Sequence, residues 1–171
     1  VGYIAMGFAI GNVYGLIGAV LHIVSHAFMK AGLFYTSGAL KYRYGIHETT
    51  YLGQVYRKMP VTSLTMVVCA LSMIGLPPFA GFFSKWYLAL GAIQKGQYTF
   101  VAVLILSSLL GAIYFFRIIE KLFMEREKIS DEENNMRTEK KGKELPWQML
   151  VPLIVVVAAV ILIGLFNAYI A

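Results

Sequence analysis

The chain alternates between long apolar stretches and short polar ones. A helix rises about 1.5 Å per residue and a bilayer core is about 30 Å thick, so about 20 apolar residues suffice to cross it. Four stretches reach that length and predict membrane spans, at residues 13–40, 60–94, 98–122 and 147–170. The pattern predicts an all-α fold, a polytopic transmembrane helix bundle forming a single membrane domain over residues 1–171.

The first apolar run, residues 1–11, is too short to cross a bilayer and ends at Gly11 and Asn12. It has neither a basic segment before it nor a small-residue cleavage site, so it does not resemble a signal peptide. We interpret it as a helix remnant. We therefore expect the chain to be the C-terminal part of a larger polytopic protein.

The apolar stretch 60–94 contains a break at residues 75–78, where Gly75 is followed by Pro77 and Pro78. Proline lacks a backbone N–H and its ring clashes with the preceding helical turn. Two short apolar halves separated by glycine and proline predict one discontinuous helix, whose freed backbone groups line an ion path. A plain kinked helix, or two separate elements, would give the same pattern.

Basic residues lie almost entirely on one side of the predicted bundle. The interfacial loop 41–59 and the stretch 121–146, which includes the charged loop 123–146, hold eleven lysines and arginines, whereas the opposite side holds only Lys95. The positive-inside rule predicts that loops 41–59 and 123–146 are cytoplasmic, or on the matrix or stroma side in an organelle. We expect a multi-pass protein of a bacterial or archaeal inner membrane. The net charge of +6 then reflects topology and lipid attraction, and no nucleic-acid partner is expected.

Composition excludes a soluble domain and gives no sign of redox chemistry. Hydrophobic residues make up 58% of the chain and charged residues only 14%, too few to cover a soluble surface. Cys69 is the single cysteine, which excludes an internal disulfide and a multi-cysteine metal cage. No glycine-rich nucleotide motif or iron–sulfur motif is present, so we expect no cofactor and no catalytic redox residue in this chain.

Candidate chemistry lies inside the apolar stretches. His22, His26 and Lys30 follow a four-residue step within span 13–40, and Lys85 lies about two turns beyond the break. An ionisable side chain at bilayer depth costs roughly 2.5–3.5 kcal/mol on insertion scales, so such residues indicate a function. Histidine titrates near neutral pH and can relay protons. Nearby hydroxyls that could hold bridging waters are Ser25, Thr36 and Ser37.

Other interpretations compete for the same residues. The two histidines could bind a metal, although the zinc-protease glutamate is replaced by Ile23, or a haem, although axial pairs usually come from two helices. They could also make purely structural contacts, and Lys85 could extend toward the membrane surface. No Asp or Glu occurs in residues 1–46 or 51–119, so an acidic partner would come from elsewhere.

Three blocks resemble one family of membrane proteins. They are GYIAMG (residues 2–7), HIVSHAFMKAGLFYTSGA (22–39) and RKMPVTSLTMVVCALSMIGLPPFAGFFSKWYLAL (57–90). The combination is similar to the C-terminal half of the proton-conducting antiporter-like subunits. These include the large membrane-arm subunits of respiratory complex I, their hydrogenase relatives, and the A and D subunits of Mrp-type sodium/proton antiporters. The resemblance covers roughly residues 1–124 and is strongest to the D-type antiporter proteins and the M/N branch of complex I.

The resemblance implies a charge-driven proton path without bond-making in this protein. Lys30 would be the central lysine, His22 and His26 would link water wires, and Lys85 would lie near the exit. The implied partners are other subunits of a multi-subunit membrane complex, the lipid bilayer, protons and, in an antiporter, sodium. Such a complex could be an NADH:quinone oxidoreductase-type translocase whose catalysis occurs elsewhere. Rival classes are a haem- or metal-binding electron carrier and a structural or solute-carrier membrane protein.

Overall fold

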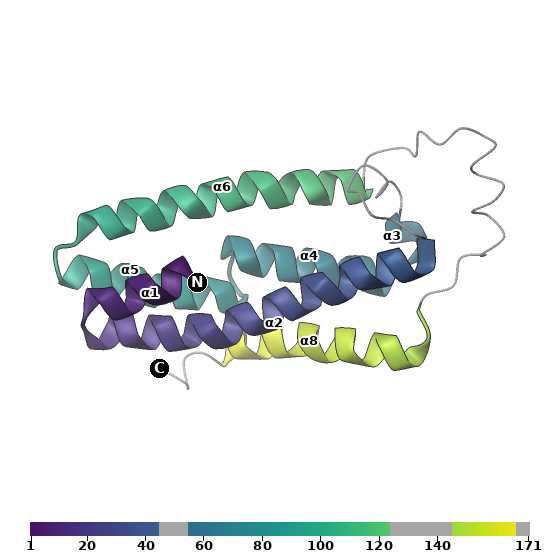
Figure 1. The fold of residues 1–171 in the computed structure, drawn as a ribbon, viewed down its shortest axis with the longest axis horizontal. Coiled ribbons are helices and arrows are strands. Elements are labelled where there is room, and N and C mark those ends of the chain that lie inside the picture. The colour runs from purple at the N-terminus through teal and green to yellow at the C-terminus, as the bar shows by residue number, and fades with distance from the viewer. Residues whose placement is uncertain (45–54, 124–144, 167–171) are drawn as a thin grey trace.

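All elements in the described part of the chain are α-helices. The computed structural model describes residues 1–44, 55–123 and 145–166. The helices are α1 (Gly2–Ile10), α2 (Val13–Tyr44), α3 (Val55–Lys58), α4 (Pro60–Ile74), α5 (Ala80–Gln94), α6 (Tyr98–Phe123) and α8 (Trp147–Leu165). They pack as an elongated bundle along one common direction (Figure 1). The predicted all-α helix bundle is therefore confirmed.

Helix α2 runs the length of the bundle and is its central element (Figure 1). It contacts α1, α4, α5 and α8. The span predicted from the sequence ends at residue 40, yet the helix continues through Lys41 and Arg43 to Tyr44. Basic side chains are favourable in the last turn, where the helix macrodipole is negative, so they prolong this helix. Of the predicted loop 41–59, residues 45–54 lie outside the described residues.

Helices α4 and α5 lie end to end beside α2, with a short non-helical segment between them (Figure 1). Each has 15 residues, or about 22 Å, so neither alone matches a bilayer core of about 30 Å. Gly75 ends α4 with φ 93°, a left-handed conformation that suits glycine, and Pro77 and Pro78 follow. Across this gap the Gly81 N–H donates to Ser72 Oγ at 3.2 Å, which ties the two helices together.

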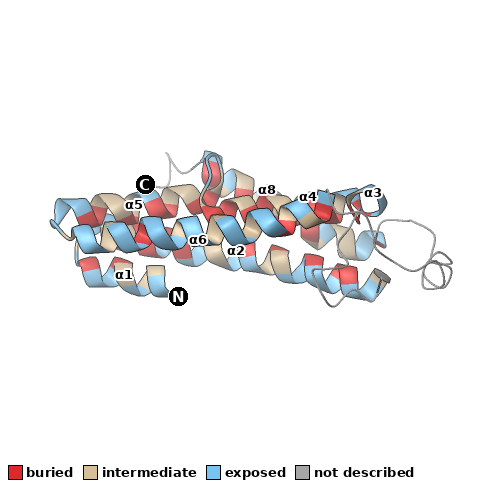
Figure 2. Ribbon diagram, turned by 90° about the horizontal axis from the view of Figure 1, so that it is seen from above, coloured by how far each residue is buried: buried red, intermediate tan, exposed pale blue. Residues whose placement is uncertain are grey.

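Three helices in the described ranges are long and apolar enough to cross a membrane: Val13–Arg43, Tyr98–Phe123 and Trp147–Leu165. Helix α8 packs against α2, α4 and α5. Helix α6 exposes most of its apolar side chains, whereas buried residues concentrate on the helices that face one another inside the bundle (Figure 2). Of the predicted loop 123–146 and span 147–170, residues 124–144 and 167–171 lie outside the described residues.

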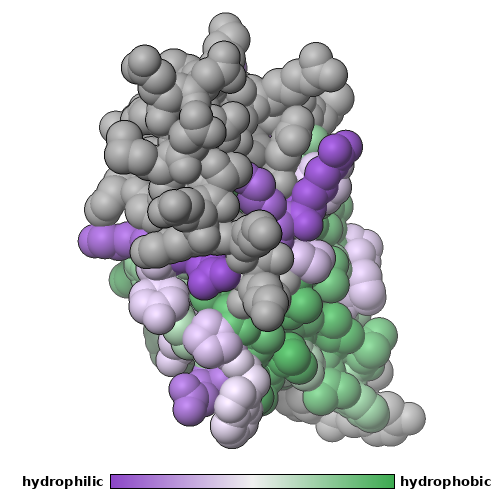
Figure 3. All heavy atoms as spheres, turned by 90° about the vertical axis from the view of Figure 1, so that its right-hand side faces the viewer, coloured by the Kyte–Doolittle hydropathy of each residue, from purple (hydrophilic) through white to green (hydrophobic). Residues whose placement is uncertain are grey.

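One apolar cluster joins the helix ends that border the charged loops. It consists of Ala39, Leu40, Val55, Met59, Ile118, Leu122, Leu145 and Leu153. The last turns of α2 and α6 and the beginning of α8 therefore meet at one end of the bundle, where hydrophilic residues gather (Figure 3). Both α2 and α6 thus end on the same side of the bundle.

Glycines let α2 and α5 approach each other closely. A Cβ added to Gly18 would lie 2.8 Å from the backbone nitrogen of Leu88, and one added to Gly91 would lie 2.7 Å from that of Gly15. Small residues are typical of membrane helix interfaces, where close packing and hydrogen bonds drive association. This contact fixes α5 against α2. It thereby also fixes the relative positions of the side chains that both helices carry near the break.

Candidate functional site

Lys85 is the one buried lysine or arginine among the described residues. Its side chain, 7% exposed, extends from α5 to the end of α4. The ammonium nitrogen Nζ donates to the carbonyl oxygens of Met73 at 3.0 Å and Ile74 at 2.8 Å, and it lies 3.0 Å from Ser108 Oγ on α6. An ammonium has three N–H donors, so these three partners satisfy it completely.

The helix break creates the environment of Lys85. The last carbonyl groups of a helix have no intrahelical partner, and the macrodipole makes this end attractive to a cation. Gly75 ends α4 here, and a Cβ at this position would lie 3.0 Å from Lys85 Cδ and 3.3 Å from Nζ. Gly75 therefore frees the acceptors and also leaves room for the lysine stem.

Ser84, the residue that precedes Lys85 on α5, forms a hydrogen bond with His22. His22 Nδ1 lies 2.9 Å from Ser84 Oγ, and the Ser84 hydroxyl donates to the Gly81 carbonyl at 3.1 Å. A hydroxyl has one hydrogen, so while it donates to the carbonyl it accepts from His22 Nδ1–H. In a neutral ring this leaves Nε2 as the proton acceptor. The 3% exposed His22 is thus oriented for proton transfer at its other nitrogen.

The structure brings the two histidines together and leaves Lys30, one helical step beyond His26, exposed. The His22 and His26 ring centroids are 5.5 Å apart, and His26 is half-buried. Lys30 is exposed and makes no hydrogen bond with the described residues. Four residues turn a helix by about 400°, so each four-residue step rotates the side chain by about 40°. Lys30 has therefore rotated by about 80° from His22, toward a face of α2 that the described helices leave uncovered.

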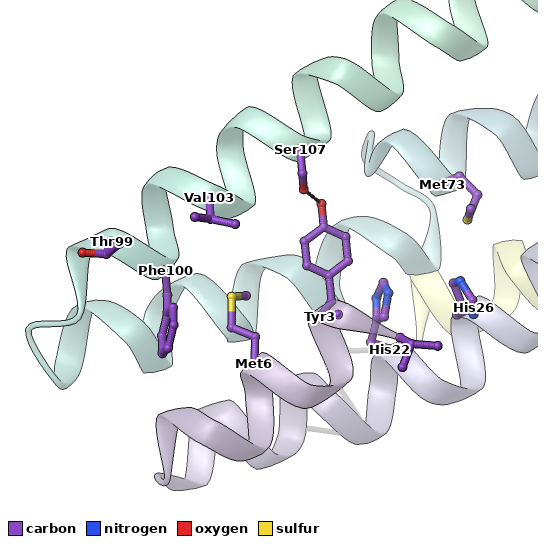
Figure 4. A pocket seen from close by; sticks show the side chains of 11 residues that line it. Tyr3, Met6, His22, His26, Met73, Thr99, Phe100, Val103 and Ser107 are labelled. Carbon is purple, nitrogen blue, oxygen red and sulfur yellow. Dashed lines mark hydrogen bonds between the residues drawn. The ribbon is translucent and has the colours of Figure 1, made fainter.

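Tyr3 of α1 lies between His22 and Lys85. Its ring meets the His22 ring edge-on at 5.2 Å between centroids, and Lys85 Nζ lies 5.2 Å from the Tyr3 centroid. The Tyr3 hydroxyl forms a hydrogen bond with Ser107 of α6 (Figure 4). Tyr3 and Ser107 border a cavity of about 580 Å³ that both histidines and Met73 also line. Tyr3 therefore connects α1, α2, α5 and α6 at the level of the break.

The charge of Lys85 has no carboxylate partner in the described ranges. Glu120 is the only acidic residue among them, and it is exposed near the end of α6. Backbone carbonyl dipoles and the face of the Tyr3 ring stabilise the ammonium instead. The described residues contain no group of three or more His, Cys, Asp or Glu side chains that could hold a metal ion.

Sequence reasoning singled out three hydroxyl residues, Ser25, Thr36 and Ser37, and did not single out Ser84 or Ser108. Thr36 Oγ1 donates to the backbone of its own helix, Ser37 is exposed, and Ser25 is fully buried with no hydrogen-bond partner among the described residues. Ser84 and Ser108 carry the contacts that matter. Their sequence signal was weak because a hydroxyl within a span can bond its own backbone, as Thr36 does.

Most of the helices that build this site fall within a known family of membrane proteins. Residues 1–111 match the family model described as NADH:quinone oxidoreductase/Mrp antiporter, TM. The chain belongs to this family. The resemblance that the sequence blocks indicated is therefore confirmed, and the chain is part of an integral, multi-pass membrane protein.

Relatives within the NADH:quinone oxidoreductase/Mrp antiporter family include proteins of both kinds. NADH-quinone oxidoreductase subunit N of Desulforudis audaxviator is 45% identical over 98% of this chain and 34% of its own length. The D subunit of the Na(+)/H(+) antiporter of Alkalihalophilus pseudofirmus is 30% identical over 96% of this chain and 32% of its own. The chain therefore spans about a third of the length of these relatives.

A solved structure shares the fold. A chain of the Mrp complex from Dietzia sp. DQ12-45-1b superimposes with a TM-score of 0.85, covering 99% of this chain and 38% of its own, at 22% identity. This likeness extends through α8, beyond the residues that the family model matches.

Proposed function

We propose that this protein is a proton-translocating subunit of a membrane complex and that His22, His26, Lys30 and Lys85 carry its protons. The observation that carries the proposal is the site of Lys85, a buried cation held by backbone carbonyls at a helix break, with no carboxylate partner among the described residues. A charged group at bilayer depth is costly and is typical of ion pathways. A structural role alone would be served by a neutral donor at the same place.

The contacts suggest how protons move near Lys85. His26 and His22 are adjacent, Ser84 orients His22, and Ser84 and Lys85 are neighbours on α5. No hydrogen bond links His22 directly to Lys85, so water or a side-chain movement would complete the transfer. A positive charge that arrives at the histidines repels the Lys85 proton, because Coulomb interactions are strong where water is scarce.

Lys30 extends this path to another part of the assembly. It is exposed in the middle of α2, where a lysine cannot face lipid cheaply. We infer that further protein covers this face, either other segments of the same protein or a neighbouring one, and that it provides the charge that Lys30 senses. The charged loops 41–59 and 123–146 are proposed to face the cytoplasm of a bacterial or archaeal cell.

We further propose that the complex is a redox-driven translocase of the NADH-quinone oxidoreductase type. The 45% identity to subunit N over nearly the whole chain favours it over the antiporter, whose D subunit is 30% identical. Sodium/proton antiport is the second candidate, supported by that antiporter relative. Sodium added to vesicles distinguishes them, because only an antiporter would release protons in exchange for it.

The test replaces each lysine by an uncharged residue in native membranes. We expect Lys85→Gln and Lys30→Gln to lower proton uptake by inverted vesicles at least tenfold during NADH oxidation, while the complex still assembles. Lys95→Gln is the matched control, because Lys95 is exposed at the end of α5 away from the site. Full proton uptake in both Lys85→Gln and Lys30→Gln would overturn the proposed function.

A further inference from the structure

We propose that Ser108 on α6 is the residue that lets Lys85 bind and release its proton while Lys85 Nζ keeps all three of its hydrogen-bond partners. This inference rests on the proposed function and adds a positioning residue to it. Ser108 is half-buried on α6, and its Oγ is the only side-chain partner among the three hydrogen-bond partners of Lys85 Nζ. The other two partners are backbone carbonyl oxygens of α4.

Lys85 Nζ finds a partner for each of its hydrogen-bonding positions in both of its protonation states. The Met73 and Ile74 carbonyl oxygens can only accept, so they use two N–H groups of Lys85 in either state. A protonated amine has a third N–H, which Ser108 Oγ accepts. A neutral amine has a lone pair instead, to which the Ser108 hydroxyl donates. Rotation of one hydroxyl hydrogen therefore keeps Lys85 Nζ fully paired in both states with the same heavy-atom positions.

Among the described residues, no titratable side chain forms a hydrogen bond with Lys85 Nζ. Tyr3 on α1 faces Lys85 with its ring, and its hydroxyl is bonded to Ser107. His22 on α2 is bonded to Ser84, and His26 and Lys30 lie farther along that helix. Helix α4 offers only Cys69, α6 carries its charges at its far end, and described α8 residues include none that titrate.

Two adjacent serines of α6 have different partners. Ser107 and Ser108 lie in an otherwise apolar part of α6, yet Ser107 contacts the Tyr3 hydroxyl and Ser108 contacts Lys85. Removing the Ser108 hydroxyl costs the ammonium more than the neutral amine, because hydrogen bonds to charged groups are stronger. Lys85 should then release its proton at a lower pH than in the wild type.

The experiment measures proton uptake and NADH oxidation by inverted vesicles at pH values from about 6 to about 10. We expect Ser108→Ala to move the alkaline limb of proton uptake down by about one pH unit, the difference between charged and neutral hydrogen bonds. Ser108→Thr, which keeps a hydroxyl, should restore the wild-type profile. Lys95→Gln, at the exposed end of α5 away from the site, should leave the profile unchanged.

A wild-type alkaline limb in Ser108→Ala, or a Ser108→Thr profile that matches Ser108→Ala, would overturn the inference. If Ser108→Ala does not assemble, Ser108→Cys replaces it, since a thiol has similar size and forms weaker hydrogen bonds. That variant should shift in the same direction, and an unshifted profile refutes the inference. If Ser108→Ala has the pH profile of the wild type and Lys85→Gln takes up no protons, only the role of Ser108 is refuted. If Lys85→Gln and Lys30→Gln both take up protons at the wild-type rate, the proposed function is refuted.

Discussion

At the scale of single residues, the Ser84 hydroxyl holds His22 and so decides which ring nitrogen is available. Ser84→Ala leaves Nδ1 buried without a partner, at a cost of about 1–3 kcal/mol. We expect proton uptake to fall roughly three- to tenfold, because the ring loses its orientation, while NADH oxidation continues. Inverted vesicles give both rates. Ser37→Ala, at an exposed position on α2, is the control, and equal uptake by both variants would contradict this role.

The residues that carry charge could be predicted from the sequence, and their partners could not. His22, His26, Lys30 and Lys85 are conspicuous because ionisable side chains are rare in apolar stretches. The carbonyl groups that hold Lys85 belong to Met73 and Ile74, whose side chains give no sign of this role. The exposure of Lys30 depends on which face of α2 the other helices cover, and spacing along one helix does not determine that.

At the scale of elements, Asn12 fixes the turn between α1 and α2 to the end of α5. Its Oδ1 accepts from the Gly15 N–H at 2.8 Å and caps α2, while Nδ2 donates to the Gly91 carbonyl at 2.9 Å. We expect Asn12→Ala to lower the free energy of unfolding by about 1 kcal/mol through the loss of the cap alone. Asn12→Asp keeps the capping oxygen and should lose less.

The measurement for Asn12 is the midpoint of thermal unfolding of the detergent-purified complex, followed by circular dichroism. We expect the midpoint to be highest for the wild type, lower for Asn12→Asp and lowest for Asn12→Ala. An Asn12→Ala midpoint equal to that of the wild type would show that α2 begins without help from this cap.

Helix positions followed from the apolar pattern, and their ends depended on chemistry that the pattern ignores. The break near Gly75 was visible because proline and glycine disrupt helices whatever surrounds them. The extension of α2 to Tyr44 was missed because polarity was taken to end the helix, although lysine and arginine are good helix formers. Polarity marks the expected edge of the membrane more directly than the end of a helix.

At the scale of the whole molecule, the exposed apolar face of α6 indicates which side meets the bilayer or a neighbouring membrane protein. Leu110, in the middle of this helix, is 67% exposed. A lysine at the centre of a span costs about 2.5–3.5 kcal/mol on insertion scales. We expect Leu110→Lys to reduce the amount of protein in the membrane fraction several-fold, whereas Leu110→Met should not. Normal amounts of Leu110→Lys would mean that this face meets water.

The capture of Lys85 by a helix end also limits how the site can be altered by substitution. Two of its three acceptors are main-chain oxygens, which every amino acid carries, so replacing Met73 or Ile74 changes their side chains and leaves the acceptors in place. Random mutagenesis should therefore find few sensitive codons around this lysine. We expect the sensitive codons to be those of Lys85, of Gly75, which shapes the helix end, and of Ser108. A site with such a small mutational target can tolerate wide sequence variation around it.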